Sequence, residues 1–316
     1  MRGLKQIGAA SVAMLAAMTS GIVATSGALA QTFELNELDD GYLTLPVTIG
    51  EAGPYSFVFD TGASHTAIAL PVAEELGFIS EWNETDRVRS LTQVFQAERF
   101  TLQEFSVAGE PAQDINAVVI PVAPQTTHTI AGLLGADALA PDGYTLNFPE
   151  RRLDLDNHRV RFEDGVYDQD LNLLFGAARI TGQRTYVLVL IDSGAPYTIV
   201  NDAFRERRTI GVELQWGVGG VGHEEETAVS ALPLRRVQIG GVCWATAYAF
   251  KADLDIFESL GWQDVPAMVM GMDLLNAGVL TVDREAGTFD FSPAFPEADC
   301  EHQRRVRYSD AIRRPS

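Results

Sequence analysis

The chain is poor in the residues on which several protein classes depend. Two cysteines, Cys243 and Cys300, occur among 316 residues, too few for a disulfide-framed mini-protein or a four-cysteine zinc site. The five histidines show no metal-site spacing, and His-Glu-x-x-His is absent from the sequence. Basic side chains number 23 against 43 acidic ones, and the resulting formal charge of -20 argues against nucleic acid as a partner. We therefore expect no metal, no cofactor and no nucleic-acid partner.

The composition that remains is that of a globular protein. Apolar residues make up 46% and charged residues 21% of the chain, which argues against a disordered or fibrous protein. The length predicts about two domains. After residue 30, no apolar run approaches the roughly 18 residues of a membrane-spanning helix.

The first thirty residues have the pattern of an export signal. Arg2 and Lys5 precede an Ala-rich stretch, and the segment ends in Ala28-Leu29-Ala30, a small-x-small cleavage site. A membrane anchor is the alternative, although the stretch is only weakly apolar. We predict a signal peptide over residues 1–30 and a periplasmic or secreted protein with no stable membrane anchor after cleavage. An oxidising compartment permits a Cys243–Cys300 bridge, which the sequence leaves open.

The rest of the sequence repeats itself. The segment Tyr55-Ser-Phe-Val-Phe-Asp-Thr-Gly-Ala-Ser resembles Tyr186-Val-Leu-Val-Leu-Ile-Asp-Ser-Gly-Ala, and their aspartates, Asp60 and Asp192, lie 132 residues apart. The same offset relates Gly50 to Gly182, Thr66 to Thr198, and Gly109 to Gly241. A register kept over this distance indicates a duplicated domain.

Further along, the offset becomes 136. Gly132–Leu139 matches Met268–Leu275, and Leu153-Asp-Leu matches Phe289-Asp-Phe. We predict one lobe over residues 31–157, a second over 158–297 and a tail over 298–316. The tail has five arginines after residue 300 and is expected to be a solvated terminus, with a functional basic arm as the alternative.

Each copy has mainly the pattern of β-strands. Residues 42–49 alternate between apolar and polar, and residues 55–59 form a short apolar run. The one clear helical signal in the first copy is Pro71–Leu76, which Gly77 ends. We predict an all-β fold of two β-barrel-like lobes related by a pseudo-twofold axis, with a few short helices.

An aspartate that follows a buried strand and precedes a small hydroxyl residue and glycine stands beside a low-dielectric core. One such site is typical of a turn aspartate. In a duplicated chain, however, a pseudo-twofold axis can bring Asp60 and Asp192 together. Charges about 3 Å apart repel by roughly 5 kcal/mol at an effective dielectric near 20. The pair would then share one proton and supply a general base and a general acid together.

These segments resemble the active-site motif of aspartic peptidases. Leu133-Leu134-Gly135 and Val269-Met270-Gly271 resemble the strands that brace the catalytic loops in that family. The resemblance is closest to the retropepsin-like branch, here as a tandem in one chain. It implies a catalytic dyad of Asp60 and Asp192, with hydroxyl hydrogen bonds exchanged across the lobes. The implied supporting residues are Thr61, Gly62, Ser64, Ser193 and Gly194.

The chain departs from the family pattern at two places. Pro196 stands where the first copy has Ser64, so hydroxyl support for Asp192 is missing there. The flap tyrosine of pepsin-like enzymes has no counterpart between Asp60 and Gly135, and Phe95 is the nearest aromatic substitute. In the second copy, Gly219 and Gly220 lie in a glycine-rich stretch that resembles a retropepsin flap.

Other interpretations of these motifs explain less. Residues 217–222 also fit a dinucleotide fingerprint, but the acidic run Glu224-Glu225-Glu226 follows where a phosphate-binding helix would begin. Asp192-Ser193-Gly194 superficially matches a chymotrypsin-like serine nucleophile, but that alternative leaves the repeat unexplained. We expect Asp137 and Asp273 to cap short helices, and His65 to be a surface or capping residue.

The expected activity is that of a metal-independent aspartic endopeptidase. Its partner would be a peptide or protein substrate bound in the cleft between the lobes, and the chain would act as a monomer. The alternative is a peptide-binding protein that kept the fold and lost turnover.

Overall fold

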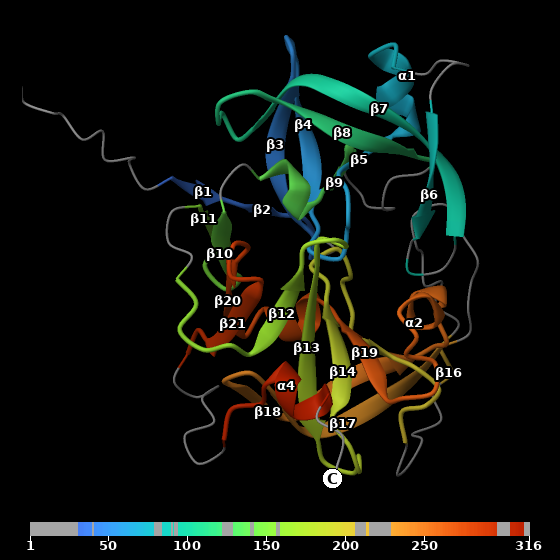
Figure 1. Cartoon of the computed structure of the whole chain (residues 1–316), viewed down its shortest axis with the longest axis vertical. Coiled ribbons are helices and arrows are strands. Elements are labelled where there is room, and N and C mark those ends of the chain that lie inside the picture. Colours follow the sequence, from blue (N-terminus) through green and yellow to red (C-terminus); the bar gives the residue numbers. More distant parts are fainter. Residues whose placement is uncertain are drawn as a thin grey trace, which may run out of the picture.

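The computed structural model describes residues 31–39, 41–78, 84–89, 91, 94–121, 129–139, 142–155, 159–205, 213–214, 229–295 and 304–312. They form two β-barrels with a few short helices (Figure 1), which confirms the predicted fold class. The predicted signal peptide lies outside the described residues. Within the described ranges, no helix is both long and apolar enough to cross a membrane.

The first barrel is built from the first half of the chain. Its strands follow the order β2-β3-β4-β9-β5-β8-β7-β6, and an additional β3–β7 pairing closes a ring of β3, β4, β9, β5, β8 and β7. Apolar side chains such as Phe57, Leu102 and Phe105 fill its core. The strands are β2 (Asn36–Glu37), β3 (Leu43–Ile49), β4 (Ala52–Phe59), β5 (Ala67–Ala69), β6 (Glu84–Arg89), β7 (Val94–Val107), β8 (Gln113–Ile120) and β9 (Gly132–Leu134).

The second barrel repeats this order with the corresponding strands. They are β13 (Leu173–Ile180), β14 (Val187–Ile191), β15 (Ile199–Val200), β16 (Glu213–Leu214), β17 (Val229–Ile239), β18 (Val242–Lys251) and β19 (Ala267–Met270). The ring β13-β14-β19-β15-β18-β17 closes through a β13–β17 pairing, and β16 lies at its edge beside β17. The sequence repeat is therefore a repeat of barrel topology.

A sheet shared by both halves joins the barrels, on the left between them in Figure 1. Its strands are β1 (Thr32–Glu34), β11 (Arg152–Asp154), β10 (Gly143–Asn147), β20 (Gly278–Asp283), β21 (Thr288–Pro293) and β12 (Gly165–Asp168), in that order. At its centre Thr145 faces Thr281, and their hydroxyls hydrogen-bond at 3.2 Å. These residues are 136 apart, so the pseudo-twofold axis passes between them. The lobe boundary near residue 157 stays a prediction.

The helices are short. They are α1 (Leu70–Glu75), the 3-10 helix η1 (Ala136–Ala138), α2 (Asp255–Ser259), α3 (Met272–Leu275) and α4 (Tyr308–Ile312). The α1 helix confirms the predicted helical segment, shifted by one residue. Because η1 and α3 follow β9 and β19, each barrel has a short helix directly after the strand that ends near the paired aspartates.

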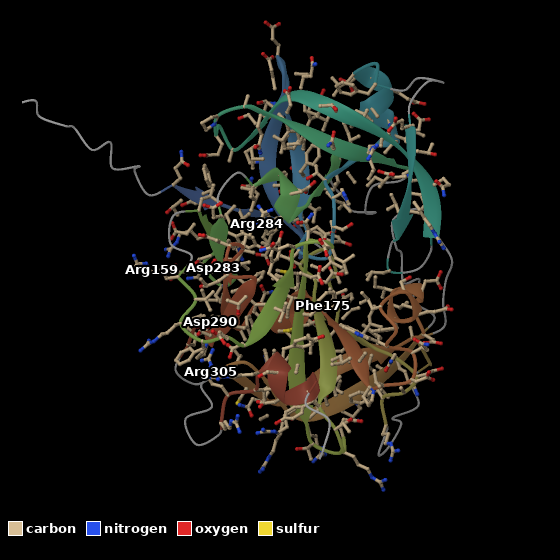
Figure 2. All side chains as sticks on the ribbon, viewed as in Figure 1. Arg159, Phe175, Asp283, Arg284, Asp290 and Arg305 are labelled. Atoms are coloured by element: carbon tan, nitrogen blue, oxygen red, sulfur yellow. The ribbon has the colours of Figure 1, made fainter. Side chains whose placement is uncertain are left out.

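The prediction of a solvated tail is wrong for residues 304–312. Arg305 forms an ion pair with the buried Asp164 and a second with Asp290, at 3.1 Å from the Asp290 carboxylate. Val306 is fully buried, and Figure 2 shows Arg305 and Asp290 on the left, beside the sheet that joins the barrels. The high arginine content suggested solvation, but Arg305 instead forms ion pairs with two carboxyls of the second half of the chain. Cys243 on β18 is disulfide-bonded, and Cys300 lies outside the described residues.

Candidate active site

Two strands whose last residues are buried bring the two motif aspartates to the same place. Asp60 follows the last residue of β4, and its N–H donates to the carbonyl of Leu134 on β9 at 3.0 Å. Asp192 follows β14 in the same way, and its N–H donates to Met270 O on β19 at 3.0 Å. The apolar residues before each aspartate anchor the strands in the barrels, so the carboxyls project where the chain leaves the sheet.

The two carboxyls contact each other. Asp60 and Asp192 share a side-chain hydrogen bond, and their residues are 8% and 3% exposed. Each carboxyl also accepts a local backbone hydrogen bond, from Gly62 N–H to Asp60 at 2.8 Å and from Gly194 N–H to Asp192 at 2.9 Å. The symmetry of the halves therefore produces a pair of aspartates at the interface between them.

Glycine at positions 62 and 194 permits this approach. A Cβ atom on Gly62 would lie 2.6 Å from Asp192 Oδ1, and one on Gly194 would lie 2.5 Å from Asp60 Oδ1. Real Cβ atoms essentially never approach a neighbour this closely. Each half thus provides the space that the carboxyl of the other half occupies.

Hydroxyl groups join the two loops below the carboxyls. Thr61 N–H donates to Ser193 Oγ at 3.0 Å, and Ser193 N–H donates to Thr61 Oγ1 at 3.0 Å. The hydroxyls in turn donate across the interface, Thr61 to Ile191 O at 3.0 Å and Ser193 to Phe59 O at 2.7 Å. Since all four groups are buried, this reciprocal arrangement fixes the spacing between the loops.

The environment opposes ionisation of both carboxyls. Burial raises the pKa of Asp60, although its hydrogen bonds partly offset the effect. Burial also raises the pKa of Asp192, and the negative charge of Asp60 raises it further, well above the ordinary value. The pair therefore retains one proton between its two carboxyls.

Asp137 and Asp273 have a different role from the predicted helix capping. Neither η1 nor α3 has a side-chain cap, because the capping positions are glycines. The Thr66 hydroxyl donates to Asp137 at 2.9 Å, and that of Thr198 donates to Asp273 at 2.7 Å. These pairs tie the chain that follows the Asp60 loop and the Asp192 loop to the short helix after β9 and after β19, respectively. Thr66 and Thr198 occupy equivalent positions in the repeat, six residues after Asp60 and Asp192, and this equivalence was the sequence signal for their shared role as partners of Asp137 and Asp273.

Ser64 does not support Asp60 in the expected way. Its hydroxyl hydrogen-bonds His65 Nδ1 at 3.0 Å, and within the described chain it has no hydrogen bond to the Asp60 carboxyl. His65 is exposed, as expected. Replacing Ser64 by Pro196 in the second copy therefore removes no hydrogen bond to the aspartate carboxyl. Asp60 and Asp192 each accept the same local hydrogen bond, from the N–H of Gly62 and Gly194.

Phe95, the predicted flap residue of the first half, lies in the β6–β7 hairpin. Phe95 on β7 faces Val88 on β6, and both pack partly buried against an apolar cluster of the first barrel. Between the two strands, Leu91 reaches the second barrel, where its carbonyl accepts a hydrogen bond from Ile256 N–H of α2 at 3.3 Å. Gly219 and Gly220 lie outside the described residues.

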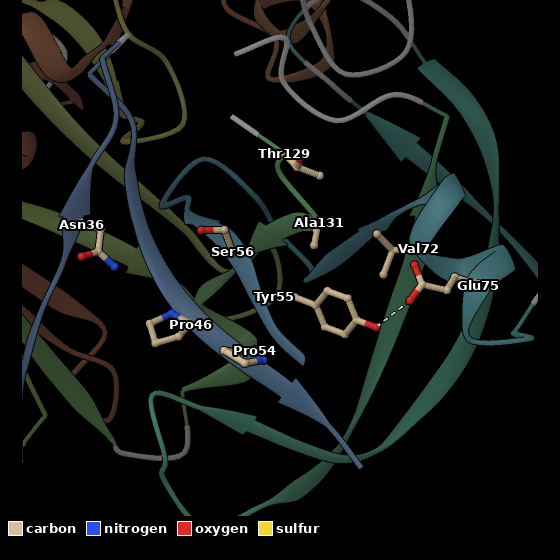
Figure 3. A pocket seen from close by; sticks show the side chains of 9 residues that line it. All are labelled: Asn36, Pro46, Pro54, Tyr55, Ser56, Val72, Glu75, Thr129 and Ala131. Atoms are coloured by element: carbon tan, nitrogen blue, oxygen red, sulfur yellow. Dashed lines mark hydrogen bonds between the residues drawn. The ribbon is translucent and has the colours of Figure 1, made fainter. Parts of the chain in front are cut away.

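Other potential sites lack comparable chemistry. Among the described residues, no three His, Cys, Asp or Glu side chains group as a metal site. A surface pocket on the first barrel lies beside Tyr55, whose hydroxyl contacts Glu75 at 3.5 Å (Figure 3). It is lined largely by β3, β4 and α1, and neither aspartate of the pair lines it.

The comparison with protein-family models agrees with the first half of this site. Residues 45–138 match the family model described as aspartyl protease. That range includes Asp60 and most of the first barrel, and it supports an aspartic peptidase family for the chain. A retropepsin-like aspartic protease from Rickettsia conorii is 21% identical, over 40% of this chain and 90% of that one, with a TM-score of 0.31. No curated protein matches.

Proposed function

We propose that the protein is an aspartic endopeptidase that acts after export to the periplasm or the medium. The hydrogen-bonded pair of buried carboxyls, one supplied by each barrel, is the observation that carries the proposal. Such a pair needs neither a metal nor a covalent intermediate to hydrolyse a peptide bond. Because one chain supplies both aspartates, the active unit is a monomer.

The chemistry follows from the single proton that the carboxyls of Asp60 and Asp192 share. The ionised carboxyl takes a proton from a water held between the two groups, and the water attacks the peptide carbonyl. The protonated carboxyl donates a hydrogen bond to the carbonyl oxygen and stabilises the negative charge that develops there. The proton taken from the water then passes to the amine as the C–N bond breaks, which releases the two product chains and leaves the pair with one shared proton again.

The proposed substrate is an extended peptide segment. A strand-like substrate lying between the barrels would add its backbone to the β6–β7 hairpin in the manner of strand addition to a sheet. Side chains near Phe95 would contact the substrate on the first barrel. A folded protein presents few extended segments, so unfolded proteins are the preferred substrates of this proposal.

The pH dependence of cleavage tests the proposal. Because burial raises the pKa of both aspartates, kcat/KM should follow a bell-shaped profile. Activity is lost at low pH when both carboxyls are protonated. It is lost again as the pH rises through the raised pKa of Asp192, because both carboxyls are then ionised. The measurement is digestion of an unfolded protein from pH 3 to 8.

Two outcomes would count against the proposal. A rate that rises continuously to pH 8 would point to a base other than the pair. An absence of cleavage at every pH, together with tight binding of peptides, would favour the alternative of a peptide-binding protein. A chelator in a parallel reaction controls for a contaminating metallopeptidase.

A further inference from the structure

A chain of hydrogen bonds from the second half of the protein ends on the catalytic loop of the first. Asn172, in the turn between β12 and β13, donates from Nδ2 to the carbonyl of Ser64 at 3.0 Å. Tyr167 on β12 donates from its hydroxyl to Asn172 Oδ1 at 2.6 Å. Arg284, after β20, donates from Nε to the Tyr167 hydroxyl at 3.1 Å.

Arginine at the start of this chain decides its direction. A guanidinium only donates hydrogen bonds, so the Tyr167 oxygen accepts from Arg284 and its proton is directed to Asn172 Oδ1. The side-chain amide of Asn172 is thereby oriented with Nδ2, its donor, toward Ser64 O. The hydrogen-bond partners of Asn172 therefore fix the orientation of its side-chain amide.

The turn is built to present this side chain. The Asp168 carboxylate accepts the N–H groups of Asp170 and Leu171, both at 3.0 Å, and closes the turn after β12. Asn172 has a φ of 55°, in the left-handed region that asparagine tolerates better than most residues. Tyr167 is buried, so the side chain that orients the amide is itself held in place.

Arg284 fixes the chain to the first half at a second point. It lies between the two barrels in Figure 2, and its Nη1 donates to Ala136 O at 3.1 Å and Leu139 O at 2.9 Å. These carbonyls belong to η1 and its end, the segment that Thr66 and Asp137 tie to the first catalytic loop. The network therefore binds the first half at two points: Asn172 holds the end of the Asp60 loop, and Arg284 holds the η1 segment to which that loop is tied.

The second catalytic loop is held differently. Pro196 O, which corresponds to Ser64 O, accepts the backbone N–H of Asp273 from its own half at 3.3 Å. The end of the Asp192 loop is thus attached within its own barrel, whereas a side chain of the opposite half holds the end of the Asp60 loop. The two loops are equal in sequence pattern but unequal in what positions them.

We propose that Asn172 is a positioning residue that sets the alignment of Asp60 against Asp192 from across the interface. This inference rests on the proposed function. The Asn172 amide donates to the carbonyl of Ser64, four residues after Asp60. Removing this amide therefore frees the end of the Asp60 loop and leaves both carboxyls of the pair in the protein. A displaced loop changes both the alignment of the reacting groups and the repulsion between the carboxyls.

The test replaces Asn172 by glycine, which accepts the same backbone conformation and removes only the amide. We expect kcat to fall about tenfold with KM within a factor of about two, since misalignment of reacting groups acts on the chemical step. The alkaline limb of the pH profile should move as well, because the negative charge of Asp60 adds to burial in raising the pKa of Asp192, and that addition depends on the spacing of the carboxyls. The measurement is steady-state kinetics from pH 3 to 8, well below the unfolding temperature.

Two further variants separate positioning from general destabilisation. Tyr167→Phe keeps the ring beside Arg284 and removes the hydroxyl, so kcat should fall in the same direction but less. The double variant should be no slower than Asn172→Gly alone, because both substitutions break one network. Asn116→Ala is the matched control, since Asn116 also accepts a hydroxyl proton, from Thr101 at 3.1 Å on an exposed strand pair; its kcat should not change.

The outcomes distinguish this inference from the proposed function. A cleaving wild-type protein whose Asn172→Gly variant has unchanged kcat and pH profile, with or without a lower Tm, overturns the positioning role alone. Additive losses in the double variant overturn the single network. A wild-type protein that does not cleave peptides contradicts the proposed function and this inference together.

Discussion

Replacing Asp60 or Asp192 by asparagine is expected to reduce kcat by roughly 10,000-fold, at the upper end of general acid–base effects. Asparagine keeps the size of the side chain but neither takes nor gives up a proton. Either substitution therefore removes the shared proton of the pair, and the two variants should be equally inactive. The measurement is single-turnover cleavage of an unfolded substrate at the pH optimum, with the exposed Asp253→Asn as a control that keeps full activity.

The same variants should be at least as stable as the wild-type protein at neutral pH. Burial raises the pKa of Asp192 in the folded protein, so the folded state binds this proton more tightly than the unfolded state does. The contribution to stability is therefore present at low pH and lost as the pH rises through the raised pKa. Asp192→Asn removes that loss, and its advantage in Tm should shrink from pH 7 toward pH 4. If the two asparagine variants are inactive because they are unfolded, the loss of activity does not come from the loss of the shared proton, and the predicted stability is contradicted.

Replacing Gly62 or Gly194 by alanine is expected to have the second largest effect. The new methyl group would meet the carboxyl of the opposite aspartate at about 2.6 Å or 2.5 Å, so the pair must separate. We expect kcat to fall by roughly 100-fold, the scale of a misplacement of about 1 Å, and the free energy of unfolding to fall by about 1–3 kcal/mol through overpacking. Activity and chemical unfolding of each variant are the measurements.

A matched control separates crowding of the pair from an effect on the backbone. Gly77 has a φ of +73° and open space around its missing side chain, whereas Gly62 and Gly194 do not have positive φ. Gly77→Ala should therefore lower stability through backbone strain and leave kcat unchanged. A Gly194→Ala variant with wild-type kcat would show that the carboxyls do not need to approach each other for activity.

The arrangement of the barrels was predictable because duplication leaves a register in the sequence. The offset of 136 residues predicted equivalent strands, and it reappears as Thr145 facing Thr281 across the axis. The encounter of Asp60 with Asp192 follows from the same symmetry. What the repeat does not reveal is which side chain supports each copy, because contacts across the axis join segments that differ between the copies.

The errors in the sequence predictions have physical causes of this kind. The hydroxyl of Ser64 hydrogen-bonds the ring of the adjacent His65 and not the Asp60 carboxyl. Asp137 occurs where a capping residue is common, but the hydroxyl of Thr66, 71 residues away, is its partner. Arg305 belongs to a run of arginines typical of solvated tails, and its placement is explained by its ion pairs with the buried Asp164 and Asp290 of the second half. Asn172 stands in an ordinary turn, with no local signal of its contact with Ser64.

The most direct test of the central claim is a crystal structure of the protein with a peptide that carries a statine-type hydroxyl, a mimic of the attacked carbonyl. We predict that this hydroxyl lies within hydrogen-bond distance of both Asp60 and Asp192, with the peptide extended between the barrels and beneath the β6–β7 hairpin. A peptide bound elsewhere, or a hydroxyl that reaches only one carboxyl because the two stand apart, would contradict the shared-proton mechanism.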